Sequence, residues 1–219
     1  MEGLLIDLER LEYLTAWKLQ IKMHKMRVCK KIPDTLLFVE HPPVITLGKN
    51  GNLKNLLVPL ESLKIPFYKI ERGGDITYHG PGQLVGYPIF SIRDGYAGIR
   101  YFIEKMEEAL INSLKAFGIE GEKREGYIGV WVGDKKIASI GIAVKRWVTF
   151  HGFALNVNTD LDFFKLINPC GFSNKSVTSI ERVLGKEVGL REVKERVKQG
   201  FEQVFNIEFK EERIETILD

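Results

Sequence analysis

The chain has 219 residues, of which 44% are hydrophobic and 28% are charged, and its formal net charge is +3. This length and composition are typical of one domain with a sizeable core, and so weak a charge argues against nucleic acid as a partner. No apolar run approaches the ~20 residues of a membrane-spanning helix, and the N-terminal MEGLLIDLERLEYL is too acidic and too interrupted for a signal peptide.

An amphipathic helix is the first predicted element, from about Glu9 to Val28. It places Leu14, Trp17, Ile21 and Val28 on one face. Its last turns are basic, and Pro33 stops it.

Short strands dominate the middle of the chain. They are predicted at 35–40, 44–48, 67–71 and 83–90, and an antiparallel meander is predicted at 127–132, 136–144 and 148–157. Helical periodicity marks residues 99–117, closed by Gly118, and residues 190–204. Strands with helices before, between and after them indicate an α+β fold.

The cysteines and histidines give no sign of a metal site. Cys29 and Cys170 are too few for a disulfide framework and favour reduced thiols in the cytosol. The four histidines lie far apart, and none has zinc-ligand spacing with a cysteine. We therefore expect a cytoplasmic protein without a metal.

The stretch RGGDITYHGPGQLVGYPIF, residues 72–90, combines five glycines with a histidine and an apolar run. Phosphate loops and dinucleotide loops both open a helix, whereas GPG here leads into a strand pattern, so no helix N-terminus is offered to an anion. Two alternatives remain: a hairpin-like bend, or a binding loop with convergent polar groups. Those groups are Arg72, Thr77, Tyr78, His79 and Gln83.

The segment KKIASIGIAV, residues 135–144, carries a lysine near the start of a strand. Regular alternation puts Lys136 on the face of Ala138, Ile140, Ile142 and Val144. A strand-end lysine either extends to solvent, which the pattern alone favours, or points into a pocket. There, desolvation lowers a lysine pKa and equips the amine for acid–base chemistry.

The segment NPCGF, residues 168–172, holds Cys170 in a tight turn between proline and glycine. Most single cysteines are inert small hydrophobes, but a rigid turn can present a nucleophilic thiol. Such a thiol needs an electropositive neighbour; the candidates are Lys136, His79 and His151. Cys29, near the end of the basic helix, is interpreted as structural.

Together these stretches resemble the lipoyl(octanoyl) transferases, acyltransferases of lipoate biosynthesis that use no cofactor. The matching segments are EHPPVITLGK (40–49), RGGDITYHGPGQLVGYP (72–88), GVWV (129–132), KIASIGIAVKRWVTFHGFALNVN (136–158), NPCGF (168–172) and VTSI (177–180). They follow the family order from Glu40 to Ile180. The sequence departs at Asp75, where the family often has glutamine, and at Phe172, where isoleucine is common; neither replaces a catalytic side chain.

The resemblance implies a mixed, mostly antiparallel sheet with flanking helices, similar to the catalytic domains of biotin and lipoate protein ligases. Residues 1–219 would form a single acyltransferase catalytic domain. The implied reaction moves an octanoyl group from octanoyl-acyl carrier protein to a lysine of lipoyl domains, in 2-oxoacid dehydrogenases and in the glycine cleavage H protein. No nucleic acid or membrane takes part, and a monomer is expected.

The resemblance also implies the site. Cys170 is the acyl-thioester nucleophile, and Lys136 lowers the thiol pKa and shuttles protons. The implied acyl-binding residues are Arg72, Gly73, Gly74, Asp75, Ile76, Thr77, Tyr78, His79, Ser139, Ile140, Gly141, Gly152, Phe153 and Ala154. We expect oxyanion donors among the backbone N–H groups near 73–74 or 141. The slot for the chain is expected at Ile140, Gly141, Gly152 and Ala154, with the glycines leaving room.

Two other functions are alternatives: an ATP-dependent lipoate-protein ligase, which does not require Cys170, and a non-catalytic module that binds lipoyl domains. The basic residues within 22–31 could dock acidic protein partners, although a solvated helix face is the favoured interpretation.

Overall fold

Two β-sheets and the surrounding helices make up the structure, a computed structural model that describes residues 1–93, 98–168 and 177–218. The large sheet has eight strands in the spatial order β11 (Glu208–Glu211), β1 (Glu2–Arg10), β2 (Thr35–Glu40), β6 (Gln83–Ile89), β10 (Val148–Asn156), β9 (Lys135–Lys145), β8 (Tyr127–Val132) and β7 (Glu122–Arg124). β1 pairs in parallel with β2 and β11, and the other neighbours are antiparallel. The predicted mixed, mostly antiparallel α+β architecture is therefore confirmed.

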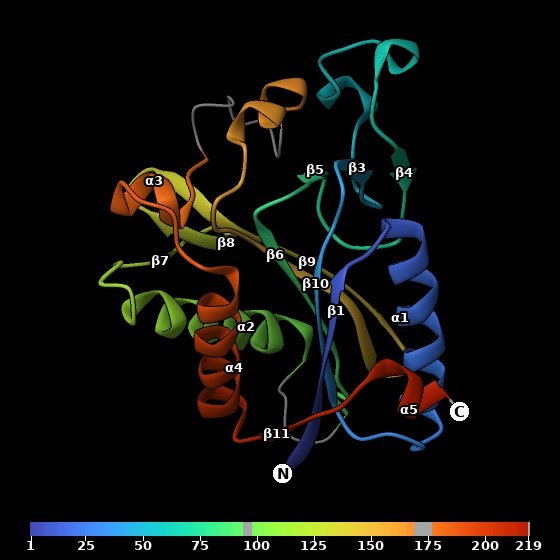
Figure 1. Ribbon diagram of the computed structural model, residues 1–219. Coiled ribbons are helices and arrows are strands. Elements are labelled where there is room, and N and C mark those ends of the chain that lie inside the picture. The colour runs from blue at the N-terminus through green and yellow to red at the C-terminus, as the bar shows by residue number, and fades with distance from the viewer. Residues whose placement is uncertain (94–97, 169–176, 219) are drawn as a thin grey trace.

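The small sheet lies at one end of the large sheet, together with three short 3-10 helices, in the upper part of Figure 1. Its strands are β4 (Phe67–Lys69), β3 (Val44–Leu47) and β5 (Ile76–His79), and the 3-10 helices are η1 (Leu53–Asn55), η2 (Leu60–Ser62) and η3 (Leu161–Leu166). The chain enters the small sheet after β2 and returns through β5 directly into β6. The segment between β4 and β5 is thereby placed beside the large sheet.

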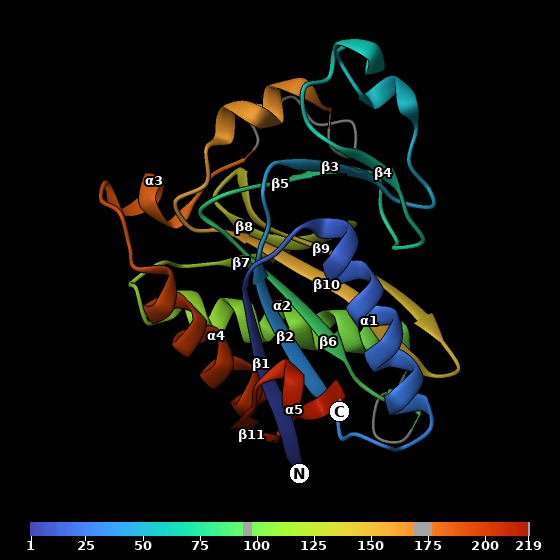
Figure 2. The same cartoon turned by 45° about the vertical axis from the view of Figure 1, so that its right-hand side comes forward.

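The helices cover both faces of the large sheet. They are α1 (Tyr13–Val28), α2 (Ile99–Lys115), α3 (Ile180–Leu184), α4 (Leu190–Phe205) and α5 (Ile214–Leu218). α2 and α4 pack on one face, where the rings of Phe90, Phe102 and Phe205 meet, and α1 and α5 lie on the other. Figures 1 and 2 show the two layers of helices with the sheet between them.

The first element differs from the prediction. Residues 2–10 form β1, and the helix begins only at Tyr13. The tertiary structure decides this, because β1 is stabilised by partners at 35–40 and 208–211 that no local periodicity reveals.

The buried face of α1 also differs. Leu14 is exposed, while Tyr13, Ala16, Gln20, Met23 and His24 are buried. Polar Gln20 and His24 can be buried because they hydrogen-bond backbone groups of β10 and β9, at His151 and Lys145. The other predicted helices and strands are present, with ends shifted by a few residues. Within the glycine-rich stretch, residues 76–79 form a strand, and a turn at 81–82, where Gly82 has a φ of +76°, leads into β6.

Candidate active site

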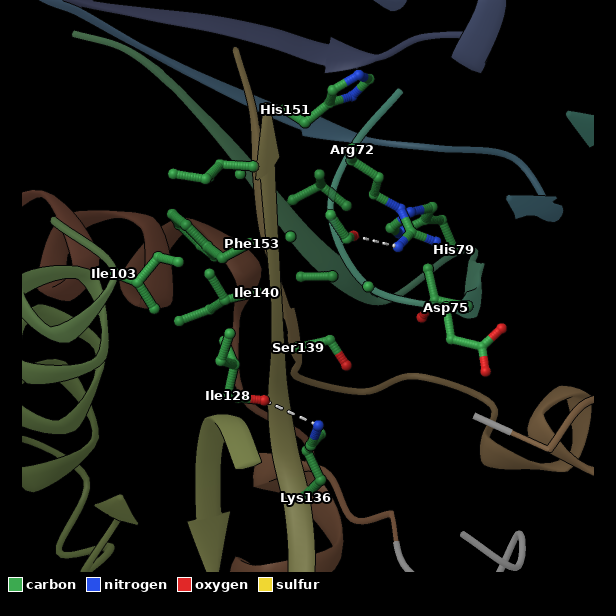
Figure 3. A pocket seen from close by; sticks show the side chains of 18 of the residues that line it. Arg72, Asp75, His79, Ile103, Ile128, Lys136, Ser139, Ile140, His151 and Phe153 are labelled. Carbon is green, nitrogen blue, oxygen red and sulfur yellow. Dashed lines mark hydrogen bonds between the residues drawn. The ribbon is translucent and has the colours of Figure 1, made fainter. Parts of the chain in front are cut away.

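A cavity of about 420 Å³ lies between the glycine-rich segment and the β9–β10 pair of the large sheet. Apolar Ile103, Ile140 and Phe153 lie on one side of β9, and Arg72, Asp75, His79 and Ser139 lie on the other (Figure 3). The volume is in the range of small-molecule pockets. All but one of the acyl-binding residues implied by the sequence line it.

The exception is Tyr78. Its side chain is fully buried, and its ring stacks on Phe163 with a centroid separation of 4.7 Å, in the core beneath the small sheet. Thr77 and His79 line the pocket instead. Consecutive side chains of a strand point to opposite faces, so Tyr78 points away from the face of its neighbours Thr77 and His79.

Arg72 anchors the glycine-rich segment to the small sheet. Its Nη2 donates to the carbonyl and the hydroxyl of Thr46, at 2.9 and 3.0 Å, and its Nη1 donates to the Gly73 carbonyl at 3.0 Å. Gly73 N–H in turn donates to the Ile142 carbonyl of β9 at 2.8 Å. The Gly73 N–H is therefore already engaged, and oxyanion donors near residues 74 or 141 stay a prediction. Gly74 follows with a φ of +83°, which favours glycine.

Asp75 lies at the rim of the cavity and ties the segment to the η1 turn. Its Oδ1 accepts hydrogen bonds from the N–H groups of Ile76 and Asn52, at 2.8 and 3.1 Å, and its Oδ2 accepts one from the Asn55 side chain. The family often has glutamine at this position. The aspartate of this chain holds the η1 turn against the glycine-rich segment.

Gly141 and Gly152 are directly paired across β9 and β10. A Cβ atom on Gly141 would lie 2.7 Å from the Gly73 carbonyl, and one on Gly152 would lie 2.0 Å from the Gly86 carbonyl. These glycines therefore allow the backbone segments to approach each other. We predicted that they leave room for the acyl chain; their first role is backbone packing.

We expect Gly152→Ala to lower the free energy of unfolding by about 2–3 kcal/mol, because the methyl group would overlap the backbone of β6. Gly73→Ala is the matched control, since its Cβ would meet only the Ile142 carbonyl at 3.4 Å; its effect should stay within about 1 kcal/mol. Urea unfolding of the two variants measures both values. Equal destabilisation would contradict the packing explanation.

His79 faces the cavity as a neutral ring of defined tautomer. Gln83 Nε2 donates to the Tyr78 carbonyl and to Asn156 Oδ1, at 3.2 and 2.9 Å, so Gln83 Oε1 is left to accept from His79 Nδ1 at 2.8 Å. The orientation of Asn156 is fixed because its Nδ2 donates to the Thr178 carbonyl. Burial lowers the pKa of His79 to about 3, and Nε2 therefore carries a lone pair at neutral pH.

His41 is a second neutral histidine next to the cavity. Its Nδ1 donates to the Leu11 carbonyl, and its Nε2 accepts from the hydroxyl of Tyr87, both at 2.7 Å. Burial lowers the pKa of His41 to about 4. The Tyr13 ring stacks on His79 at 5.9 Å, so this end of the cavity is lined by uncharged rings.

His151 lies at the opposite end of the cavity from Lys136 (Figure 3). Its φ is +57°, which is strained for a residue other than glycine, and its N–H donates to Gln20 Oε1 at 2.8 Å. The ring Nε2 is 3.6 Å from Glu71 Oε2, beyond hydrogen-bonding distance. Burial lowers the pKa of His151, more than the neighbouring Glu71 raises it, so the ring is neutral at pH 7.

Lys136 lines the other end of the cavity. Pairing shifts from Val130–Ala138 to Trp131–Lys136, so β9 has an extra residue at this point, a β-bulge. The bulge interrupts the predicted alternation, and Lys136 lies on the Ser139 side of β9, opposite Ile140 (Figure 3). Its Nζ donates to the Ile128 carbonyl at 2.9 Å and lies 4.9 Å from the centre of the Trp131 ring. The side chain therefore points into the pocket.

Cys170 lies outside the described residues. The described chain stops at Asn168 and resumes at Val177, which lines the cavity and forms a β-bridge with Lys136. Thr178 N–H then donates to the Lys136 carbonyl at 3.0 Å.

The family profile described as the lipoyl protein ligase A/B catalytic domain matches residues 12–202. The chain belongs to this family. It is 48% identical to the octanoyltransferase of Caldicellulosiruptor saccharolyticus over 208 residues, which cover 93% of this chain and 88% of that protein. It is 50% identical to the octanoyltransferase of Caldicellulosiruptor bescii over 203 residues, which cover 90% and 89%. The resemblance seen in the sequence motifs is confirmed.

Solved structures share the fold. A lipoate-protein ligase A bound with ATP superimposes with a TM-score of 0.80 at 23% identity, over 99% of this chain and 92% of the other. The biotin protein ligase of Aquifex aeolicus gives a TM-score of 0.55 at 13% identity, over 94% and 70%. At these identities the likeness establishes the architecture, as predicted for the family.

The sequence did not identify several residues that line this family member's cavity: Tyr13, Val85, Tyr87, Ile99, Ile103, Ile128, Trp131 and Phe164. Tyr13 was predicted inside a helix from about Glu9, whereas α1 begins at Tyr13, and Ile99 was predicted only as part of the apolar face of α2. The matching motifs held a signal for three of them, since Val85 and Tyr87 lie in the segment 72–88 and Trp131 lies in GVWV.

Within residues 1–93, 98–168 and 177–218, no three His, Cys, Asp or Glu side chains gather in a way that could hold a metal ion. None of the helices in this part of the chain is long and apolar enough to cross a membrane.

Proposed function

We propose that the protein transfers an octanoyl group from octanoyl-acyl carrier protein to a lysine of lipoyl domains, through a thioester on Cys170. The observation that carries this proposal is the convergence of Lys136 and the glycine-rich segment on one largely apolar cavity. The curated relatives are octanoyltransferases that match most of this chain, in agreement with that reading.

The cavity suits a saturated chain. Val85 and Ala154 are buried side chains on its floor, and the neutral rings of His79 and His151 face it. This part of the wall can receive an alkyl group without leaving a buried charge unpaired, and the guanidinium of Arg72, which also lines the cavity, is hydrogen-bonded to Thr46 and Gly73. At ~0.8 kcal/mol for each CH₂ removed from water, an eight-carbon chain gains several kcal/mol in such a site.

In the proposed reaction, the Cys170 thiolate attacks the carrier thioester, the bond to the carrier sulfur breaks, and the Lys136 ammonium gives that sulfur a proton. A lysine amine of the acceptor then attacks the enzyme thioester. The new amide bond forms as the bond to Cys170 breaks, and the neutral Lys136 takes the proton that the amine loses. A thioester is already activated, so ATP is not consumed.

Residues 1–219 act in this proposal as a single catalytic domain. The acceptors are the lipoyl domains of 2-oxoacid dehydrogenases and the glycine cleavage H protein, and the reaction takes place in the cytoplasm, where a nucleophilic thiol stays reduced. Arg72 and Asp75 hold the segment that covers the chain, while Ser139, Gly141, Gly152 and Ala154 form the floor beneath it.

Intact mass spectrometry tests this function. Incubation with octanoyl-acyl carrier protein, quenched in acid, is expected to add one octanoyl group to the enzyme. Addition of a lipoyl domain without ATP should then remove that group and octanoylate the acceptor. If the acceptor is modified only when ATP and a free fatty acid are supplied, the ATP-dependent ligase is the correct function. If neither protein gains mass, a non-catalytic binding module is favoured.

A further inference from the structure

One peptide unit beside the pocket is held from both ends. Its carbonyl, on Ile128, accepts the hydrogen bond from Lys136 Nζ at 2.9 Å. Its N–H, on Gly129, donates to Oε1 of Glu107 at 2.8 Å. A single amide therefore stands between a lysine ammonium in the cavity and a carboxylate on α2.

Glu107 is an unusual residue at its position. It is 6% exposed on the face of α2 that packs against the large sheet, among Met106, Leu110 and other apolar side chains. A buried carboxylate is costly unless it is hydrogen-bonded, and neither helix formation nor core packing requires one here. The Gly129 N–H is the partner that this carboxylate receives.

Gly129 makes the arrangement possible. Its φ is +128°, a conformation that favours glycine. A Cβ atom there would lie 2.5 Å from the Ala138 carbonyl and 3.3 Å from Cε of Lys136. This backbone conformation aims the N–H at α2 while the carbonyl of the same peptide unit aims at the pocket lysine.

We propose that Glu107 is a positioning residue for Lys136, acting through the peptide unit between Ile128 and Gly129. This inference rests on the proposed role of Lys136. A carboxylate that accepts from an amide N–H raises the negative charge on the amide oxygen. The Ile128 carbonyl thus becomes a better acceptor for an ammonium, which fixes the amine in the pocket and favours its charged form.

Other charges near this relay are Lys123 and Arg124 of β7 and Glu104 of α2. Lys123 Nζ donates to the Glu104 carbonyl at 2.9 Å, and the Arg124 guanidinium lies 4.5 Å from the centre of the Trp131 ring that Lys136 also contacts. Burial raises the pKa of Glu107, while the Gly129 N–H and the positive charges of Lys123 and Lys136 oppose the rise.

The test uses Glu107→Gln, which keeps the shape and an oxygen acceptor but removes the charge, and Glu108→Gln as the matched control. Glu108 is the next residue on α2 and pairs with Lys105 near the surface, at 3.1 Å. The pKa of Lys136 is read by NMR in protein labelled with ¹³C at lysine Cε, with the resonance assigned by its loss in Lys136→Gln. We expect Glu107→Gln to lower the Lys136 pKa by about 0.5–1 pH unit and Glu108→Gln to leave it unchanged.

The alkaline limb of the pH profile for octanoyl-enzyme formation should move down by the same amount in Glu107→Gln. An unchanged Lys136 titration in this variant overturns the relay, whatever the activity. If the wild type forms no octanoyl adduct, the proposed function is refuted. The NMR titration of Lys136 needs no turnover, so it still tests the relay in that case.

Wild-type protein gives a second measurement if Glu107→Gln does not fold. The Gly129 amide proton and the Lys136 Cε resonance should both report the titration of Glu107. A shift at Gly129 without one at Lys136 would also overturn the relay.

Discussion

Cys170→Ala is expected to abolish the octanoyl-enzyme adduct and to lower octanoyl transfer to a lipoyl domain by about 10³-fold or more. The thiol is the proposed covalent carrier, and loss of a nucleophile removes the two-step route rather than weakening it. Acid-quenched intact mass measures the adduct, and single-turnover transfer to the acceptor measures the rate.

Cys29→Ser is the matched control for this variant. Cys29 is an exposed thiol just beyond the end of α1, and its replacement should leave the adduct and the rate unchanged. Transfer that survives in Cys170→Ala, or an adduct lost in Cys29→Ser, would assign the covalent step to another residue.

Lys136→Ala is expected to slow octanoyl-enzyme formation by about 10²–10³-fold, a typical loss for a positioned acid–base group. The fold should be retained, because Lys136 is only half-buried at the rim of the sheet, and its contacts include the Ile128 carbonyl and the Trp131 ring of the neighbouring strand. The adduct is followed by rapid-quench mass spectrometry, and the melting temperature verifies the fold. Lys135→Ala, an exposed neighbour, is the control.

Lys136→Arg separates the two roles of the lysine. Arginine keeps a positive charge but does not release its proton in proteins. The positive charge beside Cys170 is kept, and the carrier sulfur can leave as a thiolate that takes its proton from water, so the first acylation should partly survive. The acceptor amine must lose a proton to a base, so transfer should stall and the octanoyl-enzyme should accumulate. Transfer from the octanoyl-enzyme at the wild-type rate would contradict the role of Lys136 as a base.

The sequence was sufficient for most of the secondary structure and for the family. The apolar periodicities of α2 and α4 and the strands of the meander appear where they were predicted, because one face of each element is buried and its pattern is local. The motifs from EHPP to VTSI pointed to the family that the profile and the relatives confirm.

Local patterns failed where the deciding partner is remote in the chain. β1 was read partly as helix because its neighbours β2 and β11 lie far away in sequence. The buried face of α1 was misplaced because Gln20 and His24 find backbone partners on β10 and β9. A periodicity argument assigns polar residues to solvent and cannot anticipate such bonds.

The residues of the site show the same difference between local pattern and tertiary structure. The sequence by itself determined which segments line the pocket, since the glycine-rich stretch and the segments around 139–141 and 152–154 do meet at one cavity. Only the tertiary structure decided what each residue does there. Arg72 anchors a loop, Tyr78 belongs to a core, and Gly141 and Gly152 admit a neighbouring backbone.

The direction of Lys136 was likewise beyond the sequence. One extra residue in β9 sets its side chain toward the pocket, and the register of a β-bulge follows from pairing between strands rather than from the composition of either one. The same holds for the peptide unit that joins Lys136 to Glu107. The hydrogen bond from the Gly129 N–H to Glu107 forms only because the fold brings β8 and α2 together.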